Sequence, residues 1–483
     1  MRMTMLRFGA GGNAEPHCLH GFHPPEHGST WSDGPFCAVT MPAPSDEPCV
    51  LVVSAKPFVA PPALEVARIR IVVDDEPLAD IPAMQDFVVC LSLPPKRKGA
   101  SVTVVFIAED ACRPTHFGQA DGRMLGVALA VLAIVETGSA LADIMSVLGE
   151  LEHGPDREIA RWAAAELLPW AVLKPSRREL ARKFDALNIA GWCQIFRISR
   201  NQVVLVAKPA VAKVSGAIAA RAALYRDFFE EIALDLPHSV QAEICMCLAD
   251  RLFAHFGIPV MAFQRPDDYA AVTIPDVEFL EHGYFENSSY TDSLPYDGKK
   301  ISAVFSGSTT GGLISLETIS MLGLPRLRAA RHFQDSKLVD FRLPNIVECA
   351  DAAAEAELRK SPFCRRPRLS WQEHLRHRFL ISLDGNGATC SRVALALKSN
   401  SALLKYESTH CLFYSRGLRP HVHYVPIGQD PDVTRVVAME QSNPGLFRGI
   451  AEAGSAFAID YLSRKMLRKY ATMLITLYAH FQV

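Results

Sequence analysis

The stretch from Ile301 to Gly312, ISAVFSGSTTGG, carries residue types that suit the binding of phosphate. A β-type run gives way there to glycines and to small residues with hydroxyl groups. Because glycine has no Cβ atom, a ligand can approach its backbone closely, and consecutive N–H groups can form a concave site for an anion. A tight turn after an edge strand is the alternative interpretation. The candidate binding residues are Gly307, Ser308, Thr309 and Thr310.

This stretch lacks the features of two familiar catalytic loops. A Walker A loop requires a lysine that is missing here. The Gly-x-Ser-x-Gly nucleophile elbow requires serine at the position that Thr309 occupies. We therefore expect neither a P-loop nor a serine nucleophile.

A second stretch, HRFLISLDGNGATCSRVALAL, predicts a strand over 379–383, a glycine turn and a helix that begins near Ser391. Such an arrangement directs several N–H groups and the positive end of a helix dipole toward one spot. Cys390 stands where a dinucleotide fingerprint has its third glycine, so the fingerprint is incomplete. Arg392 opposes the helix dipole, and a bound anion would offset this; a solvated surface arginine is the alternative. The candidate turn residues are Asp384, Gly385, Asn386 and Gly387.

Asp250 is the candidate general base. It ends the run EICMCLAD, and a carboxylate placed after a strand can accept the proton of a hydroxyl nucleophile. A helix cap or an ion pair is the alternative. The acidic Asp430-Pro-Asp432 and the pair His421 and His423 are interpreted as a polar turn and a packed strand, so no metal site is expected.

Composition limits the class of protein. The chain has 483 residues, of which 49% are hydrophobic and 21% charged, which excludes bulk disorder and predicts more than one domain. The 50 basic and 52 acidic side chains leave no overall field for nucleic acid. Residues 1–150 hold 10 basic and 17 acidic side chains, so any phosphate-bearing ligand is expected in the rest of the chain.

The cysteines and the apolar runs suggest a location. Twelve cysteines occur without a CxxC pair, which favours free thiols and the cytoplasm. The N-terminus lacks the apolar stretch of a signal peptide, and the longest apolar run, 124–135, is too short for a bilayer core of about 30 Å. No membrane anchor is expected.

The spacing of apolar residues predicts three parts. Short β-type runs over 37–135 suggest an all-β sandwich, helical periodicity follows over 140–187, and strands alternate with helices beyond Trp192. We expect a β-sandwich domain over 1–138, a helical connector over 139–187 and an α/β domain over 188–483. The last helix should pack on the core through Ile459, Leu462, Met466, Tyr470, Met473, Leu477 and Phe481. Its basic flank contains Arg464, Lys465, Arg468 and Lys469, and a helix lying on a membrane surface is the alternative.

Several short motifs beyond Trp192 occur in the order seen in one enzyme family. They are Ile258–Phe263, Ile274–Phe279, Phe305–Gly311, Leu324–Arg326, Leu338–Asp340, Leu383–Gly387 with Arg392, and His423–Pro426. Together they resemble glycosyltransferase family 90, which includes lipopolysaccharide-modifying transferases, capsule xylosyltransferases and Rumi-like O-glucosyltransferases. Ser306 stands where eukaryotic members have arginine, so any contact made by that guanidinium is absent here, and the STTG form resembles the bacterial branch.

The resemblance implies a GT-B-like domain of two Rossmann-type lobes. It also implies an inverting, metal-independent transfer of a glucose- or xylose-type sugar from a UDP-sugar to a hydroxyl of a glycan such as lipopolysaccharide or capsule. By position, Asp250 matches the catalytic base, and Gly307, Ser308 and Thr309 match the donor-phosphate loop. Arg326 and Arg392 match the arginines that hold the diphosphate. No cofactor, metal or nucleic-acid partner is implied.

The N-terminal part carries a separate resemblance. Gly21–Glu26, Thr30–Ser32 and Asp121–Val127 resemble a β-sandwich module attached to bacterial polysaccharide-building transferases, where it binds carbohydrate or a partner, or supports folding. A non-catalytic carbohydrate-binding or scaffold protein is therefore the alternative function. A glycoside hydrolase would need two facing carboxylates, and the sequence reveals no such pair. A lipid-linked acceptor would bring the basic flank at 464–469 to the inner membrane.

Overall fold

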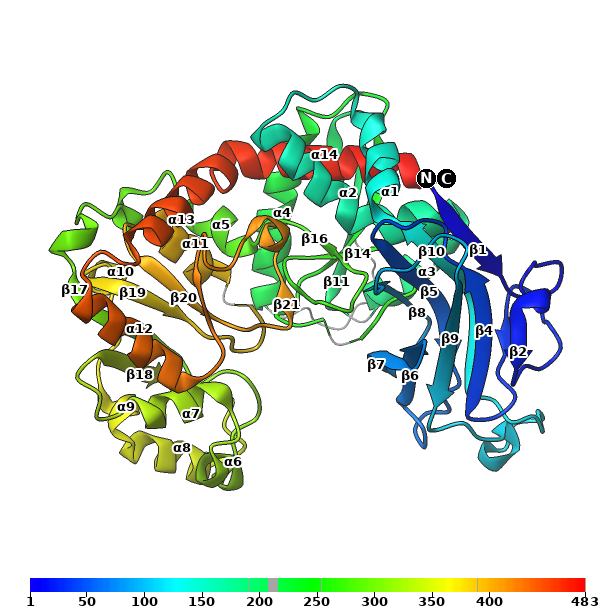
Figure 1. Ribbon diagram of the computed structural model, residues 1–483, viewed down its shortest axis with the longest axis horizontal. Helices are drawn as coiled ribbons and strands as arrows, with labels where there is room; N and C mark the ends of the chain where they lie inside the picture. Colours follow the sequence, from blue (N-terminus) through cyan, green and yellow to red (C-terminus); the bar gives the residue numbers. More distant parts are fainter. Residues whose placement is uncertain (190, 207–215, 253, 389, 483) are drawn as a thin grey trace.

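The computed structural model describes residues 1–483 except 190, 207–215, 253, 389 and 483. Two antiparallel five-stranded sheets form the N-terminal part, on the right of Figure 1. The first sheet contains β1 (Met3–Arg7), β10 (Val127–Glu136), β5 (Cys49–Pro57) and β8 (Phe87–Ser92), with β3 (Thr30–Trp31) paired to β10. The second contains β2 (Cys18–His20), β4 (Phe36–Pro42), β9 (Ser101–Ala108), β6 (Ala67–Val73) and β7 (Glu76–Ala83).

The two sheets share one apolar core, which makes the predicted all-β, sandwich-like region correct. In β6, Ile69 and Ile71 are fully buried while Arg68 is exposed, as the two-residue period of a strand requires. They pack in the same cluster as Val53 and Val89 of the other sheet. The β-type runs did not reveal β7, because its sequence EPLADIPA has few β-branched residues; proline is tolerated there since β7 is an edge strand.

Three helices follow: α1 (Thr137–Met145), α2 (Pro155–Leu173) and α3 (Arg177–Ile189). Pro155 opens α2, where a missing N–H costs nothing, and Asp156 and Glu158 in the first turn complement the helix dipole. Beyond its first turn α2 is buried on most sides, with Trp162 and Trp170 inside the core. The division of the chain at 138 and 187 stays a prediction.

A mixed sheet comes next, in the order β12 (Gln202–Leu205), β11 (Cys193–Ser199), β13 (Gln241–Cys247), β14 (Val260–Ala262) and β16 (Val272–Thr273). Successive residues of β13 face opposite sides: Ile244 packs with α4 (Gly216–Ala233), and Cys245 packs with α3. Strands β11, β12 and β13 pair antiparallel, whereas β13, β14 and β16 pair parallel. This sheet therefore departs from the fully parallel sheet expected of a Rossmann-type lobe.

The second sheet of the α/β part is fully parallel, in the order β18 (Val339–Asn345), β17 (Lys300–Ser308), β19 (His377–Ser382), β20 (Ala402–Tyr406) and β22 (Val425–Ile427). Numbered along the chain, this order is 2-1-3-4-5, so the direction of winding reverses between β17 and β19. Ligands of open α/β sheets bind outside the carboxyl ends of the strands at such a switch point. Further helices are α5 (Val277–His282), α6 (Leu316–Met321), α7 (Pro325–His332), α8 (Ala352–Lys360), α11 (Cys390–Lys398), α12 (Asp430–Ser442) and α13 (Arg448–Tyr461).

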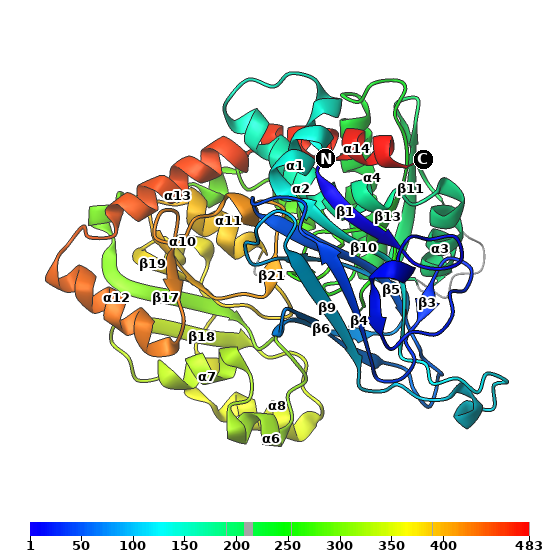
Figure 2. The ribbon, with the colours of Figure 1, turned by 45° about the vertical axis from the view of Figure 1, so that its right-hand side comes forward.

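The last helix, α14 (Arg464–Phe481), returns from the parallel sheet to lie beside α2 and the mixed sheet (Figures 1 and 2). Tyr470 and Tyr478 are buried there, and their hydroxyls donate to the carbonyls of Thr273 and Glu243, both at 2.9 Å. The predicted apolar face was wrong at Ile459, which lies in α13 and is 64% exposed, because the helix breaks before Arg464.

The basic flank of α14 is largely neutralised. Arg464 pairs with Glu231 at 2.7 Å, Arg468 with Asp235 at 2.6 Å, and Lys469 with Asp156 at 2.5 Å. These acidic partners lie on α4, just beyond its end, and on α2. Within the described part of the chain, no helix is long and apolar enough to cross a membrane.

Candidate functional site

The two predicted phosphate loops meet at the switch point of the parallel sheet. The first continues β17 and runs through Gly312; the second continues β19 and runs through Ala388. The N–H of Gly311 donates to Oδ1 of Asn386 at 3.1 Å. The fold therefore brings together two stretches that are about 75 residues apart in sequence.

Arg326 fastens these loops to each other. It lies in the first turn of α7 and is only 6% exposed. Its guanidinium donates to the carbonyls of Ser308 (2.9 Å) and Leu383 (3.0 Å) and to the hydroxyl of Thr310 (2.7 Å). Burial lowers the pKa of Arg326 to about 10, against the opposing effect of Asp384 and Glu348. Most of its donors thus bind protein oxygens, and contact with a diphosphate stays a prediction.

Arg392, near the start of α11, has more donors to offer. Its Cζ lies 4.3 Å from the ring centre of Phe305, and its Nη2 donates to the carbonyl of Ser306 at 2.7 Å. Among the described residues, its Nε and Nη1 atoms have no hydrogen-bond partner. Burial, then repulsion by Arg326 and Arg368, lowers its pKa to about 9. The charges of Arg326 and Arg368 disfavour the charged form of Arg392, Glu278 acts in the opposite direction, and a bound anion would offset the repulsion further.

Some polar groups of the loop after Phe305 are bound within the protein, and others are available to a ligand. Thr309 is fully buried, and its hydroxyl donates to the carbonyl of Val347 and accepts from the N–H of the same residue, both at 2.9 Å. That hydroxyl is therefore used by the protein. Ser308 accepts from Asn345 at 2.7 Å. In the part that the structure describes, the N–H groups of Thr310 and Gly312 have no partner and remain free to bind an anion.

Three glycines of the two loops, Gly385, Gly387 and Gly307, are required by close approach. A Cβ atom at Gly385 would lie 2.3 Å from Oγ1 of Thr310 and 2.9 Å from Cζ of Arg326. At Gly387 it would lie 2.4 Å from Oε1 of Gln264. At Gly307 it would lie 2.8 Å from the ring of Phe305. No other residue fits these positions without displacing its neighbours.

Asp384 and Asn386 bind protein groups. The carboxylate of Asp384 accepts from the hydroxyl of Ser408, and burial raises its pKa. The amide of Asn386 donates to Glu348, and its Oδ1 also accepts from Arg251 at 2.5 Å. Arg251 follows β13, so Asn386 links the parallel sheet to the mixed sheet.

Asp250 is next to this link. Its side chain is 59% exposed, and its Oδ1 lies 2.5 Å from Nη2 of Arg221. Its carbonyl accepts from the side-chain amide of Gln264, the residue that packs against Gly387. The fold therefore places the predicted base beside the predicted phosphate loops, and the alternative of an ion pair is also realised.

The loop that carries Asp250 also contacts the N-terminal sandwich. The N–H of Val88 donates to the carbonyl of Phe256 at 3.2 Å, and the amide of Gln85 donates to the carbonyl of His255 at 3.2 Å. A Cβ atom at Gly257 would lie 2.9 Å from that of Asp86. The sandwich thus forms part of the support of this loop.

Sequence reasoning missed Arg251, Gln264 and Glu348. None of the three belongs to a local sequence motif. Each reaches the site only because one sheet packs against the other or one loop packs against its neighbour. Glu348 follows β18, and its only local signal is its position a few residues after an apolar strand.

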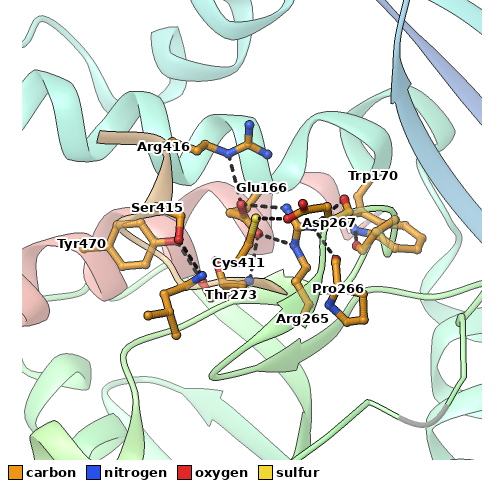
Figure 3. A network of polar contacts seen from close by, with 12 residues as sticks. Glu166, Trp170, Arg265, Pro266, Asp267, Thr273, Cys411, Ser415, Arg416 and Tyr470 are labelled. Carbon is orange, nitrogen blue, oxygen red and sulfur yellow. Dashed lines mark hydrogen bonds and ion pairs between the residues drawn. The ribbon is translucent and has the colours of Figure 1, made fainter. Parts of the chain in front are cut away.

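A second polar cluster, which we call the Glu166 cluster, surrounds the carboxylate of Glu166 (Figure 3). It joins Glu166 of α2 to Arg265, Thr273 and Arg416. Arg265 belongs to β15 (Arg265–Pro266), which pairs with β21 (His410–Cys411). The carbonyl of Thr273, whose N–H donates to Glu166, accepts from the hydroxyl of Tyr470 of α14. The cluster therefore ties α2 to the mixed sheet through Thr273, and to the β15–β21 pair and the turn after it through Arg265 and Arg416.

The other two motifs bind protein groups, but neither forms the element predicted for it. Asp430 and Asp432 lie in the first turn of α12 rather than in a polar turn, and His421 and His423 lie in the turn before β22 rather than on a strand. Asp430 starts α12 and accepts from Tyr406 at 2.8 Å and Arg328 at 3.1 Å. His423 accepts from the N–H of Arg419 and packs against Phe457. Within the described ranges, no group of three or more His, Cys, Asp or Glu side chains is arranged to hold a metal ion.

Part of this chain matches a known family. Residues 332–483 match the family model described as Glycosyl transferase family 90. This match supports a glycosyltransferase. It covers the loop over 384–387 and Arg392, and it begins after Asp250, the loop over 307–310 and Arg326. The bacterial branch stays a prediction.

Other comparisons are more distant. The chain is 24% identical over 233 residues to "Uncharacterized protein 035R" of Invertebrate iridescent virus 3; the matched part is 44% of this chain and 20% of the viral protein. The chain thus spans about a fifth of the length of that relative.

The solved structures that match part of the chain include the following two. One is the CBM36-1 domain of a multidomain xylanase from the hindgut metagenome of Trinervitermes trinervoides (11% identity, 28% of this chain and 96% of that one, TM-score 0.17). The other is a family 35 carbohydrate binding module from Clostridium thermocellum (10% identity, 28% and 89%, TM-score 0.15).

Proposed function

We propose that this protein is an inverting, metal-independent glycosyltransferase that moves a glucose- or xylose-type sugar from a UDP-sugar to a hydroxyl of a glycan such as lipopolysaccharide or capsule. The observation that carries the proposal is the set of donors at the switch point that have no partner among the described residues, on Arg392, Thr310 and Gly312, beside the loop of Asp250. The family match over 332–483 agrees with it. We further propose that the mixed and parallel sheets are the cores of the two lobes of a GT-B-like domain.

In this mechanism Asp250 removes the proton from the acceptor hydroxyl as its oxygen attacks the anomeric carbon. The bond from that carbon to the UDP oxygen breaks on the opposite face, which inverts the configuration. Negative charge grows on the departing diphosphate, and Arg392 with the loop N–H groups stabilises it more in the transition state than in the ground state. Fixed guanidinium charges take the part that a metal plays in other transferases.

The ion pair between Asp250 and Arg221 favours a second candidate, a non-catalytic carbohydrate-binding or scaffold protein. A carboxylate that serves only as a surface ion-pair partner has no catalytic task. In the transferase, acceptor binding must separate this pair so that the carboxylate faces the hydroxyl.

The acceptor and the location follow from the same proposal. UDP-sugars are cytoplasmic donors in this scheme, and a lipid-linked acceptor would bring the enzyme to the inner membrane. Because three of the four basic side chains of α14 are paired, that flank offers little free charge for anionic lipid.

Thermal unfolding in the presence of nucleotides tests donor binding. The full chain is heated with UDP, GDP, ADP, CMP and a panel of UDP-sugars, each with and without EDTA. A ligand that binds only the folded protein raises the melting temperature. We expect a rise with UDP and UDP-sugars that persists in EDTA; no rise with any nucleotide would refute the transferase and favour the scaffold.

Asp250→Asn tests the base. We expect turnover to fall about 1000-fold, since a positioned general base contributes roughly that factor, while the rise in melting temperature with UDP is retained. The matched control is Asp235→Asn, which removes an exposed, ion-paired carboxylate remote from the loops. Equal turnover in the two variants would remove Asp250 from the mechanism.

A further inference from the structure

Glu348 lies in the loop after β18, against the first phosphate loop. The N–H of Ile314 donates to the carbonyl of Glu348 at 2.8 Å, and the preceding residue, Val347, exchanges two hydrogen bonds with the hydroxyl of Thr309. Both sides of Glu348 are thereby fixed to the continuation of β17. The carboxylate therefore comes from the loop that follows β18, and β18 is the strand that pairs with β17.

The backbone of Glu348 is strained. Its φ angle is +61°, in the left-handed region that residues other than glycine rarely adopt. Such a conformation is maintained only when the surrounding contacts impose it, and it is concentrated at binding and catalytic sites. The contacts with Thr309 and Ile314 impose it here.

The carboxylate of Glu348 is half satisfied. Its Oε1 accepts from the amide of Asn386. Its Oε2 is shielded from solvent and accepts no hydrogen bond among the described residues; the nearest cation, Nη2 of Arg251, is 3.9 Å away. A shielded carboxylate oxygen without a donor is costly, and a donor supplied by a ligand would offset this cost.

The position of Glu348 in the sheet indicates which group of a ligand donates to its Oε2 atom. In doubly wound sheets that bind nucleotides, phosphate lies on the loop after the first strand, and an acidic residue near the end of the next strand accepts from a ribose hydroxyl. Here β17 is the first strand and β18 the next. Three arginines already supply positive charge at the site, so a neutral hydroxyl donor suits the carboxylate better than a further cation.

Resting on the proposed function, we propose that Glu348 accepts hydrogen bonds from the ribose hydroxyls of the nucleotide whose phosphates lie on Thr310, Gly312 and Arg392. Asn386 holds the carboxylate in place through Oε1 and leaves Oε2 for the ribose. The site consequently selects ribonucleotides over 2′-deoxyribonucleotides.

Calorimetric titration of the full chain with UDP and with 2′-deoxy-UDP tests this assignment. A hydrogen bond from a hydroxyl to a carboxylate predicts that the wild type binds UDP about tenfold or more tightly than the deoxy nucleotide. In Glu348→Gln the ratio of the two dissociation constants should fall to below about threefold, through weaker binding of UDP. Glu355→Gln, an exposed carboxylate paired with Arg359 on α8, is the control and should keep the wild-type ratio.

Glu348→Gly is a second variant that separates loss of the carboxylate from loss of stability. Glycine adopts a positive φ readily, so the folded backbone loses its strain while the carboxylate is removed. We expect a melting temperature no lower than that of the wild type, together with loss of the preference for UDP.

The outcomes separate the two proposals. If both nucleotides bind the wild type equally, or if the Glu348 variants weaken both to the same extent, Glu348 does not recognise ribose and only positions Asn386. The nucleotide site itself then stands. If neither nucleotide binds the wild type, the proposed transferase fails, and the ribose assignment fails with it.

Discussion

Glu166 and Glu348 are carboxylates held beside arginines in two different parts of the molecule, and they differ in how their oxygens are satisfied. Both oxygens of Glu166 accept two hydrogen bonds each, from Arg265 and Arg416 on one and from Arg265 and Thr273 on the other. Glu348 has one oxygen bound and, within the described part of the chain, one without a donor. The first carboxylate is complete without a ligand, and the second is not.

The arginines beside the two carboxylates differ in the same way, in how many of their donors are bound by the protein. Arg265 is buried and donates to Glu166 and to the carbonyls of Pro266 and Asp267. Arg392 is stacked on Phe305 and, among the residues that the structure describes, donates to a single carbonyl. Saturated polar groups hold parts of the chain together, whereas unsaturated ones at the carboxyl ends of parallel strands are available to a ligand.

The largest expected effect is on the saturated cluster. Glu166→Ala leaves Arg265 buried without its partner, and removing one partner of a buried ion pair typically costs about 3 to 5 kcal/mol. We expect a loss of that size in the free energy of unfolding, measured by urea denaturation. Glu158→Ala, on the exposed first turn of the same helix, should cost under about 1 kcal/mol, the size of a helix-dipole contribution. Similar losses in both variants would show that the cluster is not a structural tie.

The next effect is on activity. Arg392→Ala should reduce turnover with a UDP-sugar about 100-fold or more, a loss of roughly 2.7 kcal/mol in transition-state stabilisation. Arg326→Ala should instead lower the melting temperature, because its guanidinium connects the carbonyls of two loops. If Arg392→Ala lowered the melting temperature as much as Arg326→Ala, both arginines would be structural and the contrast between the clusters would disappear.

A smaller effect is expected from crowding the junction of the loops. Gly385→Ala places a methyl group 2.3 Å from Thr310 and 2.9 Å from Arg326, and overpacking of this kind costs about 1 to 3 kcal/mol. We expect a lower melting temperature and weaker binding of UDP. At Gly122 an added Cβ meets nothing within 4 Å, so Gly122→Ala is the control. Unchanged UDP affinity in Gly385→Ala would show that nucleotide does not bind at this junction.

The sequence predicted the loops of the site better than their partners. Glycine and hydroxyl residues after an apolar run form a local pattern, and the strand-turn-helix pattern before Arg392 is local as well. Glu348 and Arg251 were missed because their roles depend on strand order and on the contact between two sheets, which no local pattern records. The same limit explains Ile459: apolar spacing continues through the break between α13 and α14, so the sequence predicted one helix.

The all-β region shows a related limit. Strands with alternating β-branched residues, such as β6 and β9, were predicted from their sequence. The short or polar strands β1, β2, β3 and β7 form because neighbouring strands supply hydrogen bonds and a buried face, and the first three have too few residues to show a period.

Acid pH offers the most graded test of the contrast. Burial alone would raise the pKa of Glu166, but Arg265 and Arg416 together lower it to about 2 from the usual 4.5. A carboxylate whose pKa is lower in the folded state stabilises that state fully above its unfolded pKa, and this contribution disappears as the pH falls from about 4.5 toward 2. The free energy of unfolding of the wild type should therefore fall more steeply in this range than that of Glu166→Gln, by up to one proton, or about 1.4 kcal/mol per pH unit. Urea denaturation at a series of acid pH values measures both slopes, and parallel slopes would mean that Glu166 titrates normally and that its arginine partners do not hold it charged.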